Sequence, residues 1–341
     1  MLMQDWKQVR KAISEAEHIL LLPHIHADGD ALGSAFGLAY FLCGQGKTVN
    51  IFSEELPPGN LSFLYRSDRL PEGVQFSVWQ PDAESELPEH DLAIAVDTSD
   101  EKRMGNRKEL FYRAKGQIRI DHHISDATFA PITVCSTGWA AAAEGIWELI
   151  QTYEDYRRAP YLKEIAECIY AGILTDTGCF AYASVTAETH AIAAELIRIA
   201  GNMAWQYSEL YENQRKSEVA LKAAAYQKIE YYGEGRVAFL QITREEMEAV
   251  GATDDDLESF APFLRCIEEV SVGIFVKPGK TAREFRISLR SDNHCDVAAV
   301  ASQFGGGGHK RAAGLLYKEE NGAPFSEFKK ILIGEILKWM G

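Results

Sequence analysis

Short apolar segments that run into acidic and histidine residues are the feature that most constrains the fold of this chain. The first, Ile19–Leu22, is stopped by Pro23 and followed by the polar stretch His24–Gly33. Apolar residues then recur at helical spacing over Ala31–Leu42. This order predicts a buried strand, a loop and a helix. Open α/β sheets place their ligands at the carboxyl ends of their strands, which is where the loop would lie.

The polar loop contains several potential metal ligands, which are His24, His26, Asp28 and Asp30. Nitrogen and carboxylate donors at this density suit Mn²⁺ or Zn²⁺ better than a role in packing. An alternative is an Asp-Gly-Asp turn that only caps the following helix and leaves the histidines in solvent. This loop by itself does not decide between the two.

Two later segments repeat the pattern of an apolar strand followed by donors. Leu92–Val96 ends at Asp97, and Ile118–Ile120 leads into Asp121, His122 and His123. Asp97 could instead cap a helix, a common role for aspartate. Because the ends of parallel strands meet at one edge of a sheet, we expect these side chains to converge. A further carboxylate, Asp176, follows a helical segment rich in small residues.

Strand-like and helix-like segments alternate through the first half of the chain. Strands are expected at 19–22, 48–52, 92–96 and 118–120, and helices at 31–42, 137–151, 162–171 and 187–199. Such alternation predicts an α/β fold with a parallel sheet covered by helices on both faces.

The second half of the chain has a different pattern. Residues 196–232 are charged and amphipathic and indicate a helical connector. β-type runs follow at 236–242, 272–277 and 284–290, with helices near 244–250, 298–304 and 325–340. We therefore expect a catalytic domain at 1–195, a connector at 196–232 and a smaller mixed α/β domain at 233–341, with the active-site cleft between the two domains.

Two features of the last segment indicate a phosphate-binding surface. In the alternating run 286–290, Arg286, Ser288 and Arg290 share one face of a strand, and guanidinium groups bind phosphate well. The second feature is the run Gly305-Gly306-Gly307-Gly308-His309-Lys310-Arg311. Consecutive glycines allow close approach of a ligand, and their N–H groups can form an anion-binding nest. The alternatives are a solvated sheet face and a flexible linker.

Composition narrows the classes of function. The chain has 341 residues, 46% of them hydrophobic, and a formal net charge of −15. This charge argues against binding long nucleic acid, which needs a broad cationic surface. Seven basic residues and only three acidic ones nevertheless occur between Ser271 and Leu316, enough to hold a short phosphorylated ligand.

We expect no membrane association, because no apolar run approaches the ~20 residues of a membrane span. Six scattered cysteines without a Cys-x-x-Cys pair favour a reducing compartment, the cytoplasm.

The donors from the strand and helix ends form one set of candidate metal ligands: His24, Asp28, Asp30, Asp97, His122 and Asp176. These residues suffice for two divalent ions if one carboxylate bridges them. Two such ions activate a hydroxide and clamp a phosphoryl group for in-line attack. Several carboxylates combined with two histidines favour Mn²⁺.

At this point the chain resembles a known family. The ordered series His-x-x-x-Asp-x-Asp, strand-Asp, Asp-His-His and Thr-Asp-Thr-Gly is similar to the DHH phosphoesterase family. The distal Gly-Gly-Gly-Gly-His-Lys-Arg-Ala-Ala-Gly resembles its DHH-associated C-terminal domain. Together these motifs span about residues 13–338. Size and domain order resemble the stand-alone nanoRNase/pAp-phosphatase branch, which degrades very short RNAs and dephosphorylates 3′-phosphoadenosine 5′-phosphate (pAp).

The resemblance implies a role for each candidate metal ligand. His24 and Asp28 would ligate the first ion, and Asp97 would bridge both ions. The second ion would be held by Asp30, His122 and Asp176.

It also implies residues that act on the substrate. His123 would contact the scissile phosphate or assist the leaving group, with Asp97 also in a catalytic role. Asp121 would orient a neighbouring histidine. The nucleotide would be held from the second domain by Arg286, Ser288, Arg290, Gly306, Gly307, Gly308, His309, Lys310 and Arg311.

The implied function is metal-dependent hydrolysis of pAp and of oligoribonucleotides of about two to five nucleotides, including pApA. The width of a cleft between the domains is expected to limit the substrate to a few nucleotides. A homodimer is a family-level expectation. Alternatives are a cyclic-dinucleotide phosphodiesterase, an enzyme for pyrophosphate or polyphosphate, or a non-catalytic nucleotide sensor. Many relatives carry Pro where this chain has Ala27, a hydroxyl where it has Cys179 and a basic residue where it has Ala181. The last two departures bear on substrate preference.

Overall fold

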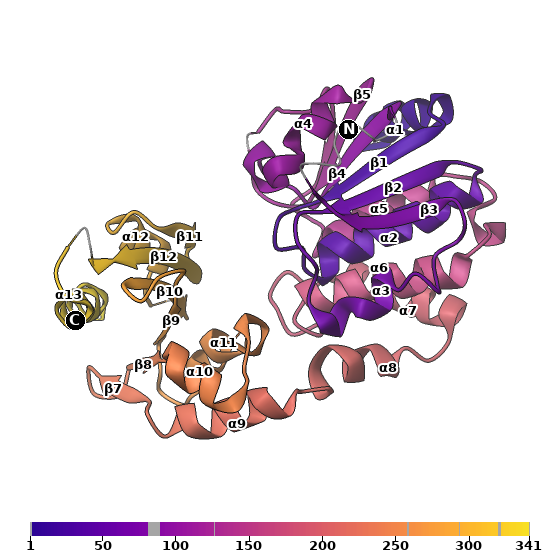
Figure 1. The fold of residues 1–341 in the computed structure, drawn as a ribbon. Helices are drawn as coiled ribbons and strands as arrows, with labels where there is room; N and C mark the ends of the chain where they lie inside the picture. Colours follow the sequence, from indigo (N-terminus) through magenta and orange to yellow (C-terminus); the bar gives the residue numbers. More distant parts are fainter. Residues whose placement is uncertain are drawn as a thin grey trace. The chain divides into compact units, whose positions relative to one another are not determined.

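The computed structural model describes residues 2–80, 89–125, 127–257, 259–292, 294–319 and 322–340. The chain divides into two compact units, Met1–Asn213 and Gln214–Gly341. Each unit contains its own sheet (Figure 1). The segment expected to be a connector, 196–232, is divided between the two units.

A parallel sheet forms the centre of the first unit. Its strands are β1 (His18–Pro23), β2 (Thr48–Ser53), β3 (Val74–Val78), β4 (Leu92–Val96), β5 (Gly116–Asp121) and β6 (Ile132–Cys135). Their order is β3-β2-β1-β4-β5-β6, and each neighbouring pair is parallel. The chain moves outward from β1 to β3 and then returns to the other side of β1 as β4. The β1–β4 boundary is therefore a topological switch point, where open α/β sheets bind their ligands.

Helices cover both faces of this sheet, as the alternation in the sequence predicted. Ile19 and Leu21 of β1 point into the larger core, whereas Leu20 and Leu22 point into a smaller core on the opposite face. The larger core is closed by α1 (Leu2–Glu15), α2 (Gly29–Gly44), α5 (Ala142–Gln151), α6 (Leu162–Asp176) and α7 (Ala187–Ala200). The smaller core is closed by η3 (Glu101–Arg107) and α4 (Lys108–Arg113).

Short helices complete the first unit. They are η1 (Gly59–Leu61), α3 (Ser62–Tyr65), η4 (Tyr156–Arg158), α8 (Ala204–Tyr207) and a π-helical turn, η5 (Ser208–Glu212). The predicted strands at 19–22, 48–52, 92–96 and 118–120 are all present, whereas β3 and β6 were not predicted. Both are at the edges of the sheet, and their residues are only partly buried. An edge strand needs a weaker apolar pattern than a central one, which explains why the sequence did not reveal them.

Helix α5 begins at Ala142, five residues later than the predicted start at 137. Its preceding residue, Ala141, has no polar side chain to cap the helix. The carboxylate of Asp30 instead accepts hydrogen bonds from the N–H groups of Ala142 (2.6 Å) and Ala143 (2.9 Å). A cap supplied from more than a hundred residues away cannot be recognised in the local sequence.

The second unit is built around a mixed sheet with the order β11-β12-β10-β9-β8-β7. Its strands are β7 (Glu230–Tyr232), β8 (Val237–Gln241), β9 (Val272–Pro278), β10 (Glu284–Ser291), β11 (Gly307–His309) and β12 (Ala312–Lys318). One face packs against α12 (Val297–Ser302) and α13 (Phe325–Lys338). The other packs against α9 (Lys216–Tyr226), α10 (Arg244–Val250), η6 (Asp254–Leu257) and α11 (Phe260–Arg265).

The glycine run forms part of a hairpin instead of an open loop. β11 pairs with β12, with His309 opposite Ala312, so that Lys310 and Arg311 form the two-residue turn. A Cβ atom on Gly306 would lie 2.3 Å from the carbonyl oxygen of Gly314. The run therefore lets a strand lie closer to its neighbour than any side chain allows.

Across the part of the chain that the structure describes, none of the helices combines the length and the apolar character that crossing a membrane would require.

Candidate metal centre

The carboxyl edge of the first sheet brings together residues that are far apart in the sequence. His24 directly follows β1, Asp97 follows β4, and His122 and His123 follow β5. Asp28 and Asp30 lie at the start of α2, and Asp176 is the last residue of α6. All of these elements belong to the first unit.

His24 and two carboxylates form the first group of donors. The Nε2 atom of His24 lies 3.3 Å from Asp97 Oδ2 and 3.7 Å from Asp28 Oδ2. Its Nδ1 atom lies 2.6 Å from the carbonyl oxygen of Ile25, so Nδ1 carries the proton and Nε2 is available as a ligand. The side chain of His24 is buried, which excludes the alternative that it is free in solvent.

His122 and two other carboxylates form a second group. Its Nε2 atom lies 3.5 Å from Asp176 Oδ2 and 3.8 Å from Asp30 Oδ2. In each of the two groups, all the donor atoms lie within 4.8 Å of one another. The first group contains the residues expected for one ion, and the second contains those expected for the other apart from the bridging Asp97; that they bind metal stays a prediction.

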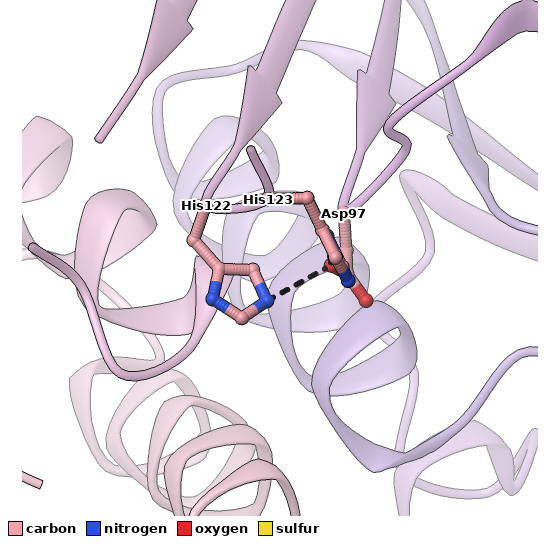
Figure 2. A group of neighbouring side chains, drawn as sticks. All are labelled: Asp97, His122 and His123. Carbon is pink, nitrogen blue, oxygen red and sulfur yellow. Dashed lines mark ion pairs between the residues drawn. The ribbon is translucent and has the colours of Figure 1, made fainter. Parts of the chain in front are cut away.

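Asp97 lies between the two groups. Its Oδ1 atom is 3.5 Å from His122 Nε2 and 3.4 Å from His123 Nδ1, while Oδ2 faces His24. Figure 2 shows these three side chains together, with the ring of His122 facing the carboxylate of Asp97. Its backbone has φ of 51°, a left-handed conformation that is rare for residues other than glycine and concentrated at functional sites.

The surroundings of Asp97 fit a bound cation. The side chain is buried, and Oδ1 accepts no hydrogen bond from any residue that the structure describes. A buried carboxylate oxygen that only faces two histidine rings, without accepting a hydrogen bond, is incompletely satisfied, and a metal ion would satisfy it. Carboxylate and imidazole groups are also the usual ligands of divalent Mn and Zn.

The pKa values of the site reflect its excess of negative charge. Burial lowers the pKa of His24, but Asp28 and Asp97 outweigh this effect and raise it to about 10. The pKa of His122 is likewise raised to about 10, mainly by Asp97 and Asp30 against the effect of burial. Burial and the neighbouring Asp28 and Asp97 raise the pKa of Asp176 to about 6. The protein without metal therefore holds protons where cations would bind.

The Asp-Gly-Asp turn both caps a helix and contributes to the cluster. Asp28 Oδ1 accepts hydrogen bonds from the N–H groups of Asp30 and Ala31 at the start of α2. Its other oxygen, Oδ2, faces His24. His26, considered with these donors in the sequence, instead points into solvent and pairs with Glu55. It lies outside the donor groups.

Asp121 supports the site from behind. Its Oδ1 atom lies 2.9 Å from His123 Nδ1, and its Oδ2 atom pairs with Arg119. Arg119 is itself buried and donates to the carbonyl oxygens of Thr98 and Ala127. Sequence reasoning missed Arg119, although a charged residue inside the apolar run 118–120 was a usable signal.

The candidate nucleotide-binding residues all lie in the second unit. Arg286, Ser288 and Arg290 lie on the face of β10 opposite the buried Ile287 and Leu289, as the alternation predicted. The glycines and the three basic residues after them lie on the β11–β12 hairpin, where His309, Lys310 and Arg311 are exposed.

Comparisons with known proteins agree with this architecture. Residues 18–173 match the DHH family, N-terminal domain, and residues 235–335 match the DHHA1 domain. Two relatives are named bifunctional oligoribonuclease and PAP phosphatase NrnA. The relative from Thermus thermophilus is 29% identical over 88% of this chain and 84% of its own length. The relative from Bacillus subtilis is 27% identical over 89% of this chain and 90% of its own.

A solved structure shows the same fold over almost the whole chain. It is an exopolyphosphatase-related protein from Bacteroides fragilis, with a TM-score of 0.87 and 26% identity. The match covers 99% of this chain and 98% of that protein. With both domains matched in order, and with the DHH motifs gathered at the switch point of the sheet, the chain belongs to the DHH phosphoesterase family.

Proposed function

We propose that this protein is a metal-dependent phosphoesterase that hydrolyses short oligoribonucleotides, including dinucleotides such as pApA, to mononucleotides, and that also converts pAp to AMP. The names of the relatives support an oligoribonuclease and pAp phosphatase. The proposal extends further, to two divalent ions and to Mn²⁺ as the metal.

The position of Asp97 is the observation that carries this proposal. Its two carboxylate oxygens face two histidines, His24 and His122, each of which has its own further carboxylates. Such an arrangement fits a residue that bridges two cations. His24 and Asp28 would hold the first ion, and Asp30, His122 and Asp176 the second. The mixture of carboxylates and imidazoles favours Mn²⁺.

When bound, a pair of divalent ions supplies Lewis acidity to a phosphoryl group and lowers the pKa of water. The chain's own residues position the reacting groups. Asp121 accepts from His123 Nδ1 and thereby directs the opposite edge of the ring outward, where it can donate to the scissile phosphate or to the leaving oxygen. Arg119 holds Asp121 in place. Burial raises the pKa of Asp121, but the hydrogen bonds from His123 and Arg119 outweigh this effect and lower it to about 2, so the carboxylate stays charged.

The second unit supplies the residues that we propose for nucleotide binding. Arg286, Ser288 and Arg290 present two guanidinium groups and a hydroxyl from one strand face, which suits a phosphate. The exposed His309, Lys310 and Arg311 add donors at the hairpin beside Gly306, Gly307 and Gly308. We also propose that the protein acts as a homodimer in the cytoplasm.

A substrate panel tests the function. Purified protein with Mn²⁺ is given pApA, pAp, cyclic di-AMP and pyrophosphate side by side, and the products are resolved by length. We expect AMP from pApA and from pAp, and little turnover of the other two. Preferred hydrolysis of cyclic di-AMP or pyrophosphate would overturn the proposed substrate class, and tight binding without product would indicate a sensor.

Asp97→Asn tests the centre itself. It should reduce turnover of pApA by at least about 100-fold, because it removes the charge shared by both donor groups. The matched control is Asp155→Asn, since the Asp155 side chain is 86% exposed and lies outside the cluster. If Asp97→Asn retained the activity of the Asp155→Asn control, the proposed mechanism would be wrong.

A further inference from the structure

The first unit carries a group of exposed aromatic residues that the mechanism does not use. Tyr182 is 61% exposed, Tyr207 is 46% exposed and Tyr211 is 39% exposed. We call these three residues the tyrosine patch. All three belong to the first unit, which also holds the metal centre. Exposed aromatic rings that gather in one place, unlike rings exposed singly, mark contact with a partner or a ligand.

A strained turn leads from the metal centre into the patch. After Asp176, three consecutive residues have left-handed backbones: Gly178 (φ 55°), Cys179 (φ 58°) and Phe180 (φ 65°). Such conformations are costly for residues with side chains and persist where the surrounding structure imposes them. Here Thr177 imposes the turn, since its side-chain hydroxyl accepts from the N–H of Phe180 and its carbonyl oxygen from that of Tyr182.

The turn holds the ring of Tyr182 over its own backbone. A Cβ atom placed on Gly178 would lie 2.5 Å from two atoms of that ring, so the ring occupies the space that the glycine leaves open. Gly178 is only two residues from Asp176, whose Oδ2 atom is 3.5 Å from His122. Tyr182 is therefore held in place on the turn that directly follows a residue of the metal centre.

The other two tyrosines complete the tyrosine patch. The Tyr211 side chain lies near the Cys179 thiol of the same turn and near Tyr182. The rings of Tyr207 and Tyr211 lie 5.2 Å apart, centre to centre. Burial, together with Cys179, Tyr182 and Tyr207, raises the pKa of Tyr211 above its usual range, so its phenol stays neutral. Tyr207 is the last residue of α8, and Tyr211 lies on the π-helical turn η5. π-Helical turns are rare in proteins, and those that occur are often at functional sites.

The two segments that carry the patch offer no positive charge of their own to hold a phosphate. The segments 177–182 and 207–212 contain no lysine or arginine, whereas Glu209 and Glu212 are both in the second segment. A neutral flat ligand beside a phosphate-cleaving centre is a nucleobase, and stacking on aromatic side chains is how proteins hold unpaired bases.

We propose that the tyrosine patch is a stacking subsite for one base of the bound oligoribonucleotide, and that it favours dinucleotides over pAp, which has a single base. This inference rests on the proposed phosphoesterase function. The subsite acts on recognition of the substrate and takes no part in the chemical step.

Abasic dinucleotides provide the test. Steady-state hydrolysis with Mn²⁺ is measured for pApA and for its two analogues that lack the 5′ or the 3′ base. We expect the unmodified protein to have a KM about 5- to 100-fold higher for one analogue than for pApA. The double variant Tyr182→Ala/Tyr211→Ala should raise the KM for pApA to that of this analogue and leave the kinetics of the analogue unchanged. Tyr182→Phe, which keeps the ring, should behave as the unmodified protein does.

Tyr112→Ala is the matched control, because Tyr112 is 44% exposed on α4, away from the turn. It should leave all three substrates unaffected. If the double variant slowed pApA and both analogues equally, or changed none of them, the stacking subsite would be refuted while the phosphoesterase function stood. Absence of turnover of pApA by the unmodified protein would instead refute the proposed function.

Discussion

At the scale of single residues, the metal centre is a cluster of charges that only cations can balance. Asp30 and Asp97 are buried together, and burial with the charges of Asp97 and Asp176 raises the pKa of Asp30 well above its ordinary value. In the absence of metal, the protonated His24 and His122 supply the balancing charge. Protons and divalent ions therefore compete for one site.

This competition predicts that metal binding releases protons at neutral pH. The pKa values of His24 and His122 are about 10 in the metal-free protein, so both rings are protonated at pH 7.5 and must lose a proton to become ligands. Titration calorimetry with Mn²⁺ in two non-coordinating buffers of different ionisation enthalpy should give at least two protons released per protein, with Asp30, whose pKa is also raised, as a further source. Equal heats in the two buffers would contradict the assignment of these ligands.

The same pKa shifts determine how the stability of the metal-free protein depends on pH. Because the pKa of each histidine is raised above its unfolded value of 6.5, their ion pairs contribute fully to the free energy of unfolding below pH 6.5. This contribution is lost as the pH rises through about 10. The melting temperature of the metal-free protein should therefore fall between pH 7 and 10, and the Asp97→Asn variant, which lacks a partner of both rings, should show a smaller fall.

Arg119 predicts a large effect on stability. Arg119→Met would leave the buried carboxylate of Asp121 without its guanidinium partner, a change that costs about 3–5 kcal/mol. Urea unfolding of the first unit measures the loss. Arg158→Met, at an exposed ion pair with Asp155, should change stability by less than about 1 kcal/mol. The double variant Arg119→Met/Asp121→Asn should recover part of the loss, and no recovery would argue against the pair as its cause.

At the scale of elements, the β11–β12 hairpin depends on particular glycines. Gly308 has φ of 145°, and a Cβ atom there would lie 2.5 Å from the carbonyl oxygen of Ala312. A Cβ atom on the neighbouring Gly307 would meet nothing within 4 Å. The geometry of this three-residue strand therefore requires a glycine at position 308 but not at position 307.

These two glycines form a matched pair of variants. Gly308→Ala should destabilise the second unit by about 1–3 kcal/mol, because the backbone is strained and the neighbouring strand is too close. Gly307→Ala should be within about 1 kcal/mol of the unmodified protein. Chemical denaturation of both variants measures the difference, with hydrogen exchange locating it at the hairpin. Equal stabilities would show that the hairpin yields without cost.

At the scale of the whole molecule, charge sets the size of the substrate. The chain has a net charge of −15, while the region from Ser271 to Leu316 has seven basic and three acidic residues. A long RNA needs a broad cationic surface, whereas a dinucleotide needs only a local one. An acidic enzyme whose basic residues are confined to local regions is therefore suited to short substrates.

This balance predicts a steep dependence on chain length. With Mn²⁺ and RNAs of two, three, five and 24 nucleotides at equal concentration, kcat/KM should fall at least about 10-fold between the five- and 24-nucleotide substrates, since each added phosphate meets net negative charge. A 24-nucleotide DNA of the same sequence serves as a control for binding alone. Equal rates on all the RNAs would contradict the argument from charge.

The sequence by itself was sufficient to determine the α/β class, the central strands and the chemistry of the donors. These are local properties: β1, β4 and β5 are apolar runs ended by polar residues. α10 was predicted near its observed bounds, 244–250, and in the structure a local capping box of Thr243 and Glu246 starts it. The family's motifs added the residues of the candidate site, whose metal-binding roles remain predictions.

Only the tertiary structure decided what depends on contacts between distant segments. The start of α5 follows from a cap supplied by Asp30, and the donors meet because β4 returns beside β1. The hairpin at the glycine run and the ring of Tyr182 over Gly178 also depend on close approaches that no local pattern encodes. The physical reason is the same throughout: propensity and periodicity act along the chain, whereas burial, capping from a distance and steric fit act through space.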